Sequence, residues 1–136
     1  MNMSMDVSYT LVTHAVEAML DKKARDVTVM DMRDVAGFVD YFVIGTGDSE
    51  LQIKAVAEEV RARLHTQCGE KPWHLEGADV WQWVLLDYVD VVVHVFSPEK
   101  RAFYDLERLW GDAPKKHADP TGLLHEGGLR TSGGAG

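Results

Sequence analysis

The amino-acid sequence predicts one α/β domain, with a mixed sheet of about five strands and helices packed on it. Its 136 residues are enough to bury a self-sufficient core. Short β-branched runs are interleaved with longer segments whose apolar residues recur at helical spacing. The predicted order of elements is therefore α-β-β-α-β-β-β-α.

The first part of the chain predicts a helix followed by two strands. Ser8 can cap this helix, whose apolar positions are Leu11, Val12, Ala15, Val16, Met19 and Leu20. Residues 26–32 alternate and are rich in β-branched side chains, so they predict a strand. Residues 33–39 predict a turn. Residues 40–45, DYFVIG, predict a second strand that is buried on both faces.

A second helix and a third strand are expected next. Ser49 and Gln52 have the spacing of a capping box, and Gly69 ends the helical pattern. Residues 71–76 predict a short strand. After a hairpin, Ser-Pro at 97–98 has the pattern of a helix start. The predicted apolar face of this last helix consists of Ala102, Phe103, Leu106, Leu109 and Trp110.

The hairpin is predicted at residues 81–96, WQWVLLDYVDVVVHVF. The simplest register has a two-residue loop at residues 88–89. In this register the opposed pairs are Asp87 with Asp90, Leu85 with Val92, Trp83 with His94, and Trp81 with Phe96. Residue 89 is a valine, which is poorly suited to such a loop, and two opposed carboxylates repel each other. A longer or bulged turn would shift this register.

Alternation along the hairpin separates its side chains into two faces. One face is aliphatic and is expected beneath the helices; it carries Val84, Leu86, Val91, Val93 and Val95. The other face carries the tryptophans, the aspartates, His94 and Phe96, with Tyr88 expected at the tip. Aromatic anchors within a polar rim are typical of a protein-binding surface. The alternative is that other segments of the chain cover these rings.

The domain is expected to end near residue 111. Residues 1–111 hold the predicted elements. Residues 112–136 contain six of the twelve glycines and few large apolar residues. We therefore expect a mostly disordered, Pro- and Gly-rich tail.

Charge and cysteine content narrow the function classes. The formal net charge is −8, and His74 to Phe96 contains four acidic residues but no lysine or arginine. This balance favours a basic protein partner and predicts little direct contact with nucleic acid. A lone cysteine, the absence of an apolar run of membrane-spanning length and the absence of a secretory signal predict a cytoplasmic protein.

Sequence motifs for phosphate binding, metal binding or catalysis are weak throughout the chain. The turn GTGDS at 45–49 joins a strand to a helix, but it matches no phosphate-binding fingerprint. Asp87 and Asp90 could converge on Mg²⁺, yet no basic group lies near them in the sequence. The six histidines form no metal-ligand spacing. We predict no catalytic residues, no metal site and no cofactor.

Several linked motifs closely resemble one protein family. They are DYFVIGTG at 40–47, EG at 76–77, WVLLDYVDVVVHVF at 83–96 and RAFYDLERLW at 101–110. In this order and spacing they are similar to the ribosomal silencing factors, also called the RsfS or Iojap family. The likeness extends over roughly residues 8–114.

The resemblance implies a fold related to nucleotidyltransferases but without catalytic carboxylates, and a protein that is not an enzyme. It implies binding to the large ribosomal subunit through a ribosomal protein of the L-fourteen family. Occupation of that site would block joining of the small subunit and dampen translation. It also implies a homodimer when the protein is free.

Site residues follow from the same resemblance. The motifs place Trp83 and Tyr88 on the partner-binding surface. The remaining residues that match the motifs around them are Asp87, Asp90, His94, Glu76 and Gly77. One departure is Val89, which stands where many family members have glycine.

Two other functions stay open from the sequence. A nucleotidyltransferase-like enzyme would need Asp87 and Asp90 as metal ligands and residues 45–49 as a nucleotide cradle. A factor for assembly or maturation of the large subunit would bind a similar target at a different time.

Overall fold

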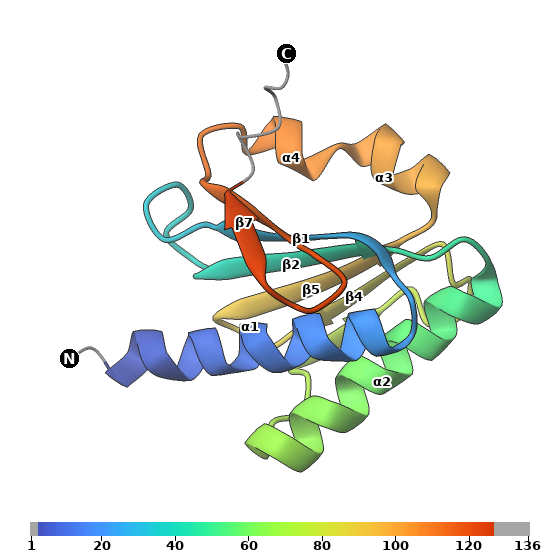
Figure 1. Ribbon diagram of the computed structural model, residues 1–136, viewed down its shortest axis with the longest axis horizontal. Coiled ribbons are helices and arrows are strands. Elements are labelled where there is room, and N and C mark those ends of the chain that lie inside the picture. Colours follow the sequence, from blue (N-terminus) through green and yellow to red (C-terminus); the bar gives the residue numbers. More distant parts are fainter. Residues whose placement is uncertain (1–2, 127–136) are drawn as a thin grey trace.

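A computed structural model describes residues 3–126 of the chain. Its centre is a seven-stranded mixed sheet in the order β3-β4-β5-β2-β1-β6-β7 (Figure 1). The strands are β1 (Arg25–Asp31), β2 (Tyr41–Thr46), β3 (His74–Glu76), β4 (Trp83–Asp87), β5 (Val91–Phe96), β6 (Lys115–Ala118) and β7 (Leu124–Glu126). The helices are α1 (Met3–Asp21), α2 (Glu50–Cys68), α3 (Pro98–Tyr104) and α4 (Leu106–Leu109). The mixed α/β class predicted from the sequence is confirmed.

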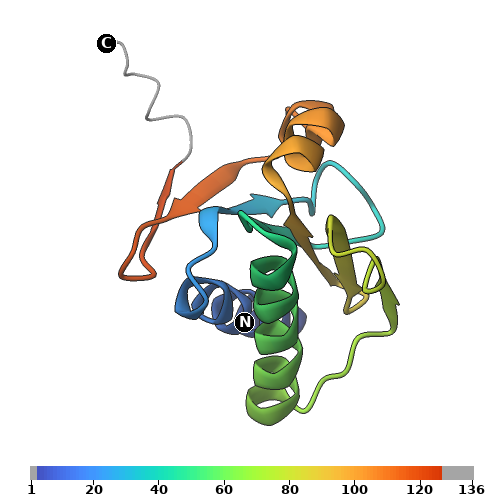
Figure 2. The same ribbon diagram turned by 90° about the vertical axis from the view of Figure 1, so that its right-hand side faces the viewer.

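The helices cover the two faces of the sheet unequally (Figures 1 and 2). The long helices α1 and α2 lie side by side on one face, where a cluster of 22 buried residues forms the main core. The short helices α3 and α4 lie over the other face, above a cluster of nine buried residues. The second face therefore has the thinner cover.

Local signals were accurate for the central strands and for α2. β2 is buried at every position and lies parallel to β5, as expected for a strand covered on both faces. The Ser49 hydroxyl accepts a hydrogen bond from the Gln52 amide, and Gly69 ends α2 in the left-handed conformation. The Ser97 hydroxyl accepts from the Lys100 amide and starts α3.

The predicted start of the first helix is wrong. α1 begins at Met3, so Ser8 lies inside the helix. The Ser8 side chain is buried and its hydroxyl donates a 2.9 Å hydrogen bond to Asp40. A serine before an apolar stripe can equally be a polar residue that faces a long-range partner.

The predicted disorder from residue 112 is wrong for residues 112–126. β6 pairs antiparallel with β1, and β7 pairs with β6, which extends the expected sheet of about five strands to seven. These strands are short and bracket a turn at Asp119 to Gly122. Pairing of β6 with β1 joins this hairpin to the sheet, and local composition does not reveal such pairing. Residues 127–136 of the predicted tail lie outside the described residues.

The continuous last helix is also a wrong prediction. It breaks at Asp105, whose φ of 46° ends α3 and begins α4. Of the predicted apolar face, Leu106 is buried, whereas Phe103 is 76% exposed and Leu109 is 68% exposed. Within residues 3–126, no helix is long and apolar enough to cross a membrane.

Candidate partner-binding surface

The hairpin has the predicted faces but a different register. Trp83 pairs with Phe96, Leu85 with His94, and Asp87 with Val92, so each pairing is shifted by two residues from the expected one. A shift of two residues keeps every side chain on its face, whereas a shift of one would have exchanged the faces.

The turn lies one position later than expected, at Val89 and Asp90, so Tyr88 is opposite Val91 and every pairing moves by two residues. Val89 adopts a φ of 75°, a left-handed conformation that glycine takes without strain and valine does not. The Asp87 carboxylate accepts a 2.7 Å hydrogen bond from the Val89 amide. The Tyr88 amide donates a 2.8 Å hydrogen bond to the Val91 carbonyl. These hydrogen bonds hold a turn that is costly for valine.

Trp83 lies on the thinly covered face of the sheet and is half-buried. Its indole stacks on Phe96 at 4.9 Å between centroids and contacts the ring of Tyr104 at 4.5 Å. Tyr104 in turn contacts Phe103 at 5.0 Å. We call Trp83, Phe103 and Tyr104 the aromatic surface. It continues a buried aromatic layer out to solvent.

His94 supports Trp83 from within the sheet. The Trp83 Nε1–H group donates a 3.1 Å hydrogen bond to His94 Nδ1, which places the imidazole proton on Nε2. His94 is only 4% exposed, and Phe42 packs edge-on against its ring. Burial lowers the pKa of His94 to about 3, so the ring is neutral at physiological pH. His94 is thus a support for the aromatic surface and not a part of it.

Tyr88 is not at an exposed tip, contrary to the sequence prediction. It is 5% exposed and belongs to the main core beneath α1 and α2. Continued alternation from Val84 and Leu86 directs residue 88 to this face. Its hydroxyl has no hydrogen-bond partner among the described residues, and burial raises the pKa of Tyr88 to about 12. Trp83 and Tyr88 therefore lie on opposite faces, and one flat partner cannot contact both rings.

The other predicted site residues surround Trp83 in different ways. Gly77 has a φ of 87°, and a Cβ there would lie 1.9 Å from the Trp83 carbonyl oxygen, so only glycine permits this close approach. Glu76 is exposed and pairs with His74 at 2.8 Å. Asp90 is exposed as well. These acids add negative charge beside β4, in β3 and in the loop that follows β4.

Sequence reasoning placed Phe103 in a core, and for that reason missed it as a surface residue. Tyr104 was missed altogether. No local signal in the sequence separates them from the buried Leu106, because the break at Asp105 sets their directions. The exposed Phe38 extends the apolar character of this side, because its ring packs edge-on against Trp110 at 6.3 Å.

Several of the residues considered for metal and nucleotide binding are engaged in structural contacts. Asp48 forms a bidentate pair with Arg25, with 2.6 Å between its closest atoms. A Cβ on Gly47 would lie 2.7 Å from the Ile53 side chain, so this glycine permits helix packing. Asp87 caps the hairpin turn. Within residues 3–126, no group of three or more His, Cys, Asp or Glu residues could hold a metal ion.

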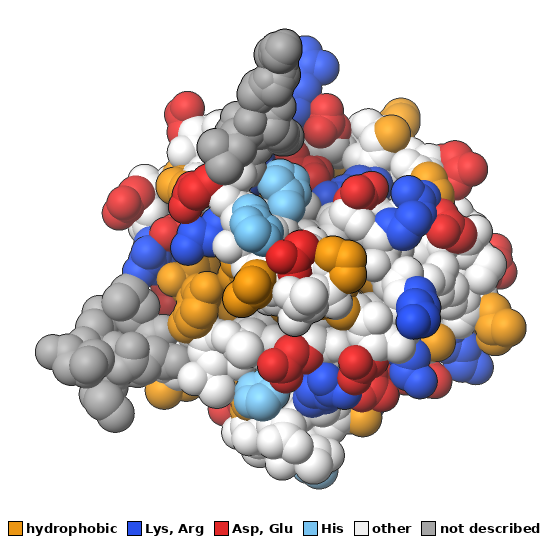
Figure 3. All heavy atoms as spheres, in the orientation of Figure 1, with side chains coloured by type: hydrophobic (Ala, Val, Ile, Leu, Met, Phe, Trp, Pro, Cys, Tyr) orange, Lys and Arg blue, Asp and Glu red, His pale blue; other side chains and the backbone are white. Residues whose placement is uncertain are grey.

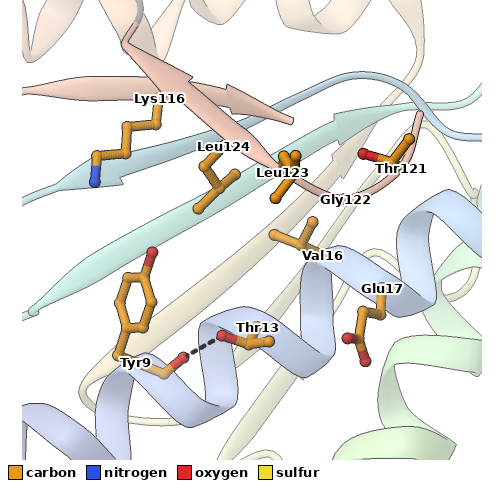
Figure 4. Close-up of a pocket in the computed structure, with 9 residues that line it drawn as sticks. All are labelled: Tyr9, Thr13, Val16, Glu17, Lys116, Thr121, Gly122, Leu123 and Leu124. Atoms are coloured by element: carbon orange, nitrogen blue, oxygen red, sulfur yellow. Dashed lines mark hydrogen bonds between the residues drawn. The ribbon is translucent and has the colours of Figure 1, made fainter. Parts of the chain in front are cut away.

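A groove of about 490 Å³ lies at a distant part of the molecule, between α1 and the β6–β7 hairpin (Figure 4). Hydrophobic side chains gather at this junction on the face seen in Figure 3. The lining combines apolar and hydroxyl groups with one cation and one anion: Tyr9, Thr13, Val16, Glu17, Lys116, Thr121, Gly122, Leu123 and Leu124. None of them belongs to the predicted site residues.

Comparison with known proteins identifies the family. Residues 6–130 match the family model described as "Ribosomal silencing factor during starvation". The chain is 42% identical over 105 residues to ribosomal silencing factor RsfS of Bacillus subtilis, which covers 77% of this chain and 88% of that protein. It is 34% identical over 97 residues to "Mitochondrial assembly of ribosomal large subunit protein 1" of mouse, covering 70% of this chain and 42% of that protein.

Solved structures agree with this result. A crystal structure from Chromobacterium violaceum superposes with a TM-score of 0.73 at 36% identity, covering 76% of this chain and 86% of the other. A second crystal structure, from Bacillus halodurans, superposes with a TM-score of 0.68 at 42% identity, covering 75% of this chain and 94% of the other. The resemblance noted in the motifs is thereby confirmed, and the chain belongs to the family of ribosomal silencing factors.

Proposed function

We propose that this protein binds the large ribosomal subunit through a ribosomal protein of the L-fourteen family and blocks joining of the small subunit. Translation is lowered by steric exclusion, which requires no catalysis, cofactor or metal. The observation that carries the proposal is the aromatic surface, which is solvent-exposed on the thinly covered face of a ribosomal silencing factor. Its place of action would be the cytoplasm.

The composition of this surface suits a basic ribosomal protein. Exposed rings at Phe103 and Tyr104 can bury a large apolar area, and aromatic residues dominate the energy of many interfaces. Acidic side chains are exposed beside β4: Glu76 in β3, and Asp79 and Asp90 in the loops before and after β4. Such charges orient a basic partner and accelerate its association.

The test is a subunit-joining measurement. Large subunits are incubated with the protein, small subunits are added, and light scattering follows association as the magnesium concentration is raised. We expect wild-type protein to slow joining in a dose-dependent manner. Phe103→Ala should weaken binding by about 2 kcal/mol if this ring is an anchor.

A matched control is Leu51→Ala on α2. Leu51 is 78% exposed, close to the 76% of Phe103, but it belongs to the helix that covers the opposite face. It should bind and inhibit like wild type. Equal inhibition by both variants and wild type would remove the aromatic surface from the proposal.

A role in assembly of the large subunit is the second candidate. It is favoured by the printed name of the mouse relative, which describes assembly of the mitochondrial large subunit. Binding to precursor subunits without any effect on the joining of mature subunits would favour this role.

We also propose that the free protein is a homodimer. An exposed apolar surface of this kind tends to be covered when its partner is absent. Sedimentation analysis of wild type and Phe103→Ala tests this idea, and a monomeric wild type at micromolar concentration would refute it.

A further inference from the structure

The α3–α4 segment carries the aromatic surface but has little apolar anchorage of its own. α3 contains no buried residue, and α4 contains only Leu106. The chain bends between the two helices at Asp105. Exposed rings on such a segment would have no fixed direction unless another interaction held the bend against the sheet.

Arg101 supplies that interaction through hydrogen bonds to three other elements of the fold. Its guanidinium donates three hydrogen bonds: 2.7 Å to the Asp26 carbonyl, 2.9 Å to the Thr46 hydroxyl and 3.1 Å to the Thr28 hydroxyl. It also pairs with Glu107 at 2.5 Å. The Arg101 side chain is only 13% exposed, and both threonines are buried. One side chain thus ties α3 to β1, β2 and α4.

The Arg101–Glu107 pair spans the bend itself. The Asp105 amide donates to the Arg101 carbonyl, and the Leu109 amide donates to the Asp105 carbonyl, so the two helices meet at this residue. The planar guanidinium has five donors in a fixed fork, which can satisfy oxygen atoms on both sides of the bend at once. A lysine has the charge without this geometry.

We propose that Arg101 is a positioning residue for the aromatic surface: it fixes Phe103 and Tyr104 beside Trp83 before a partner arrives. This inference rests on the proposed function. A surface that is ordered in advance loses less conformational entropy on binding. Arg101 itself does not need to contact the partner, because its charged group is directed into the protein.

The experiment measures the dissociation constant for purified large ribosomal subunits. Arg101→Met removes every hydrogen bond and keeps most of the aliphatic stem, and it should raise the dissociation constant at least about tenfold. Arg101→Lys should restore little of the affinity. Glu107→Gln is a milder variant that weakens only the link to α4, and it serves if Arg101→Met does not fold.

The matched control is Arg63→Met on the opposite side of the sheet. Arg63 also forms a partly buried ion-pair network: it pairs with Asp21 of α1, which joins the two helices, and with Glu59 of its own helix. Its loss should lower the thermal unfolding temperature and leave the dissociation constant within about twofold of wild type.

A double-mutant cycle separates positioning from a general structural role. If Arg101 acts through the aromatic rings, Tyr104→Ala in the Arg101→Met background should weaken binding no further than the stronger single change. Additive losses, or normal affinity in folded Arg101→Met and Glu107→Gln, would overturn the inference alone. Failure of wild type to bind large subunits would overturn the proposed function and this inference with it.

Discussion

The two faces of the sheet differ in what covers them, and this difference separates stability from recognition. One face lies beneath two helices of 19 residues each and has 22 buried residues, almost all aliphatic. The other lies beneath helices of seven and four residues and has an aromatic layer that continues to the surface. Consecutive residues of β4 and β5 contribute to opposite faces, so neighbouring positions in the sequence have different physical roles.

The largest expected effect separates two neighbouring leucines. Leu86 is fully buried in the main core, and Leu86→Ala should lower the free energy of unfolding by about 3 kcal/mol. Leu85 is half-exposed on the aromatic side, and Leu85→Ala should lower the free energy of unfolding by about 1 kcal/mol or less. Urea unfolding of both variants provides the measurement. Similar losses would show that both faces are packed equally.

A pH titration sharpens the role of His94. Its pKa is about 3 in the folded protein and near 6.5 when unfolded, so the unfolded chain binds more protons between these values. Stability should therefore be full above pH 6.5 and fall as the pH drops, by about 1.4 kcal/mol per unit within this window. His94→Phe should remove this contribution to the slope. Equal slopes in urea unfolding of both proteins at pH 6.5 and 5 would contradict a buried neutral imidazole.

The smallest effect concerns Tyr88, on the helix-covered face. Its buried hydroxyl has no partner among the described residues, so Tyr88→Phe should stabilise the fold by about 1 kcal/mol. The same variant should bind large subunits like wild type, because residue 88 faces away from the aromatic surface. If Tyr88→Phe bound large subunits more weakly while remaining as stable as wild type, Tyr88 would belong to the partner-binding surface and this prediction would be wrong.

Much of this fold is determined by local sequence. Period-two alternation assigned Val84 and Leu86 to the core and Trp83 to the opposite face, and that assignment survived an incorrect register. The cap at Ser49 and the stop at Gly69 were evident because each requires only its immediate neighbours. The family motifs within residues 40–110 were sufficient to indicate the family itself.

Tertiary structure alone decided the remaining features, because they depend on contacts between distant residues. The hairpin register depends on a left-handed Val89 that the Asp87 side chain supports. β6 pairs with β1, roughly 90 residues earlier in the chain, and β7 pairs with β6; Arg101 reaches Thr28 across 73 residues. Local propensity contains no information about such partners. The sequence by itself therefore determined which residues could form a recognition surface, and the packing of distant segments decided which of them reach solvent.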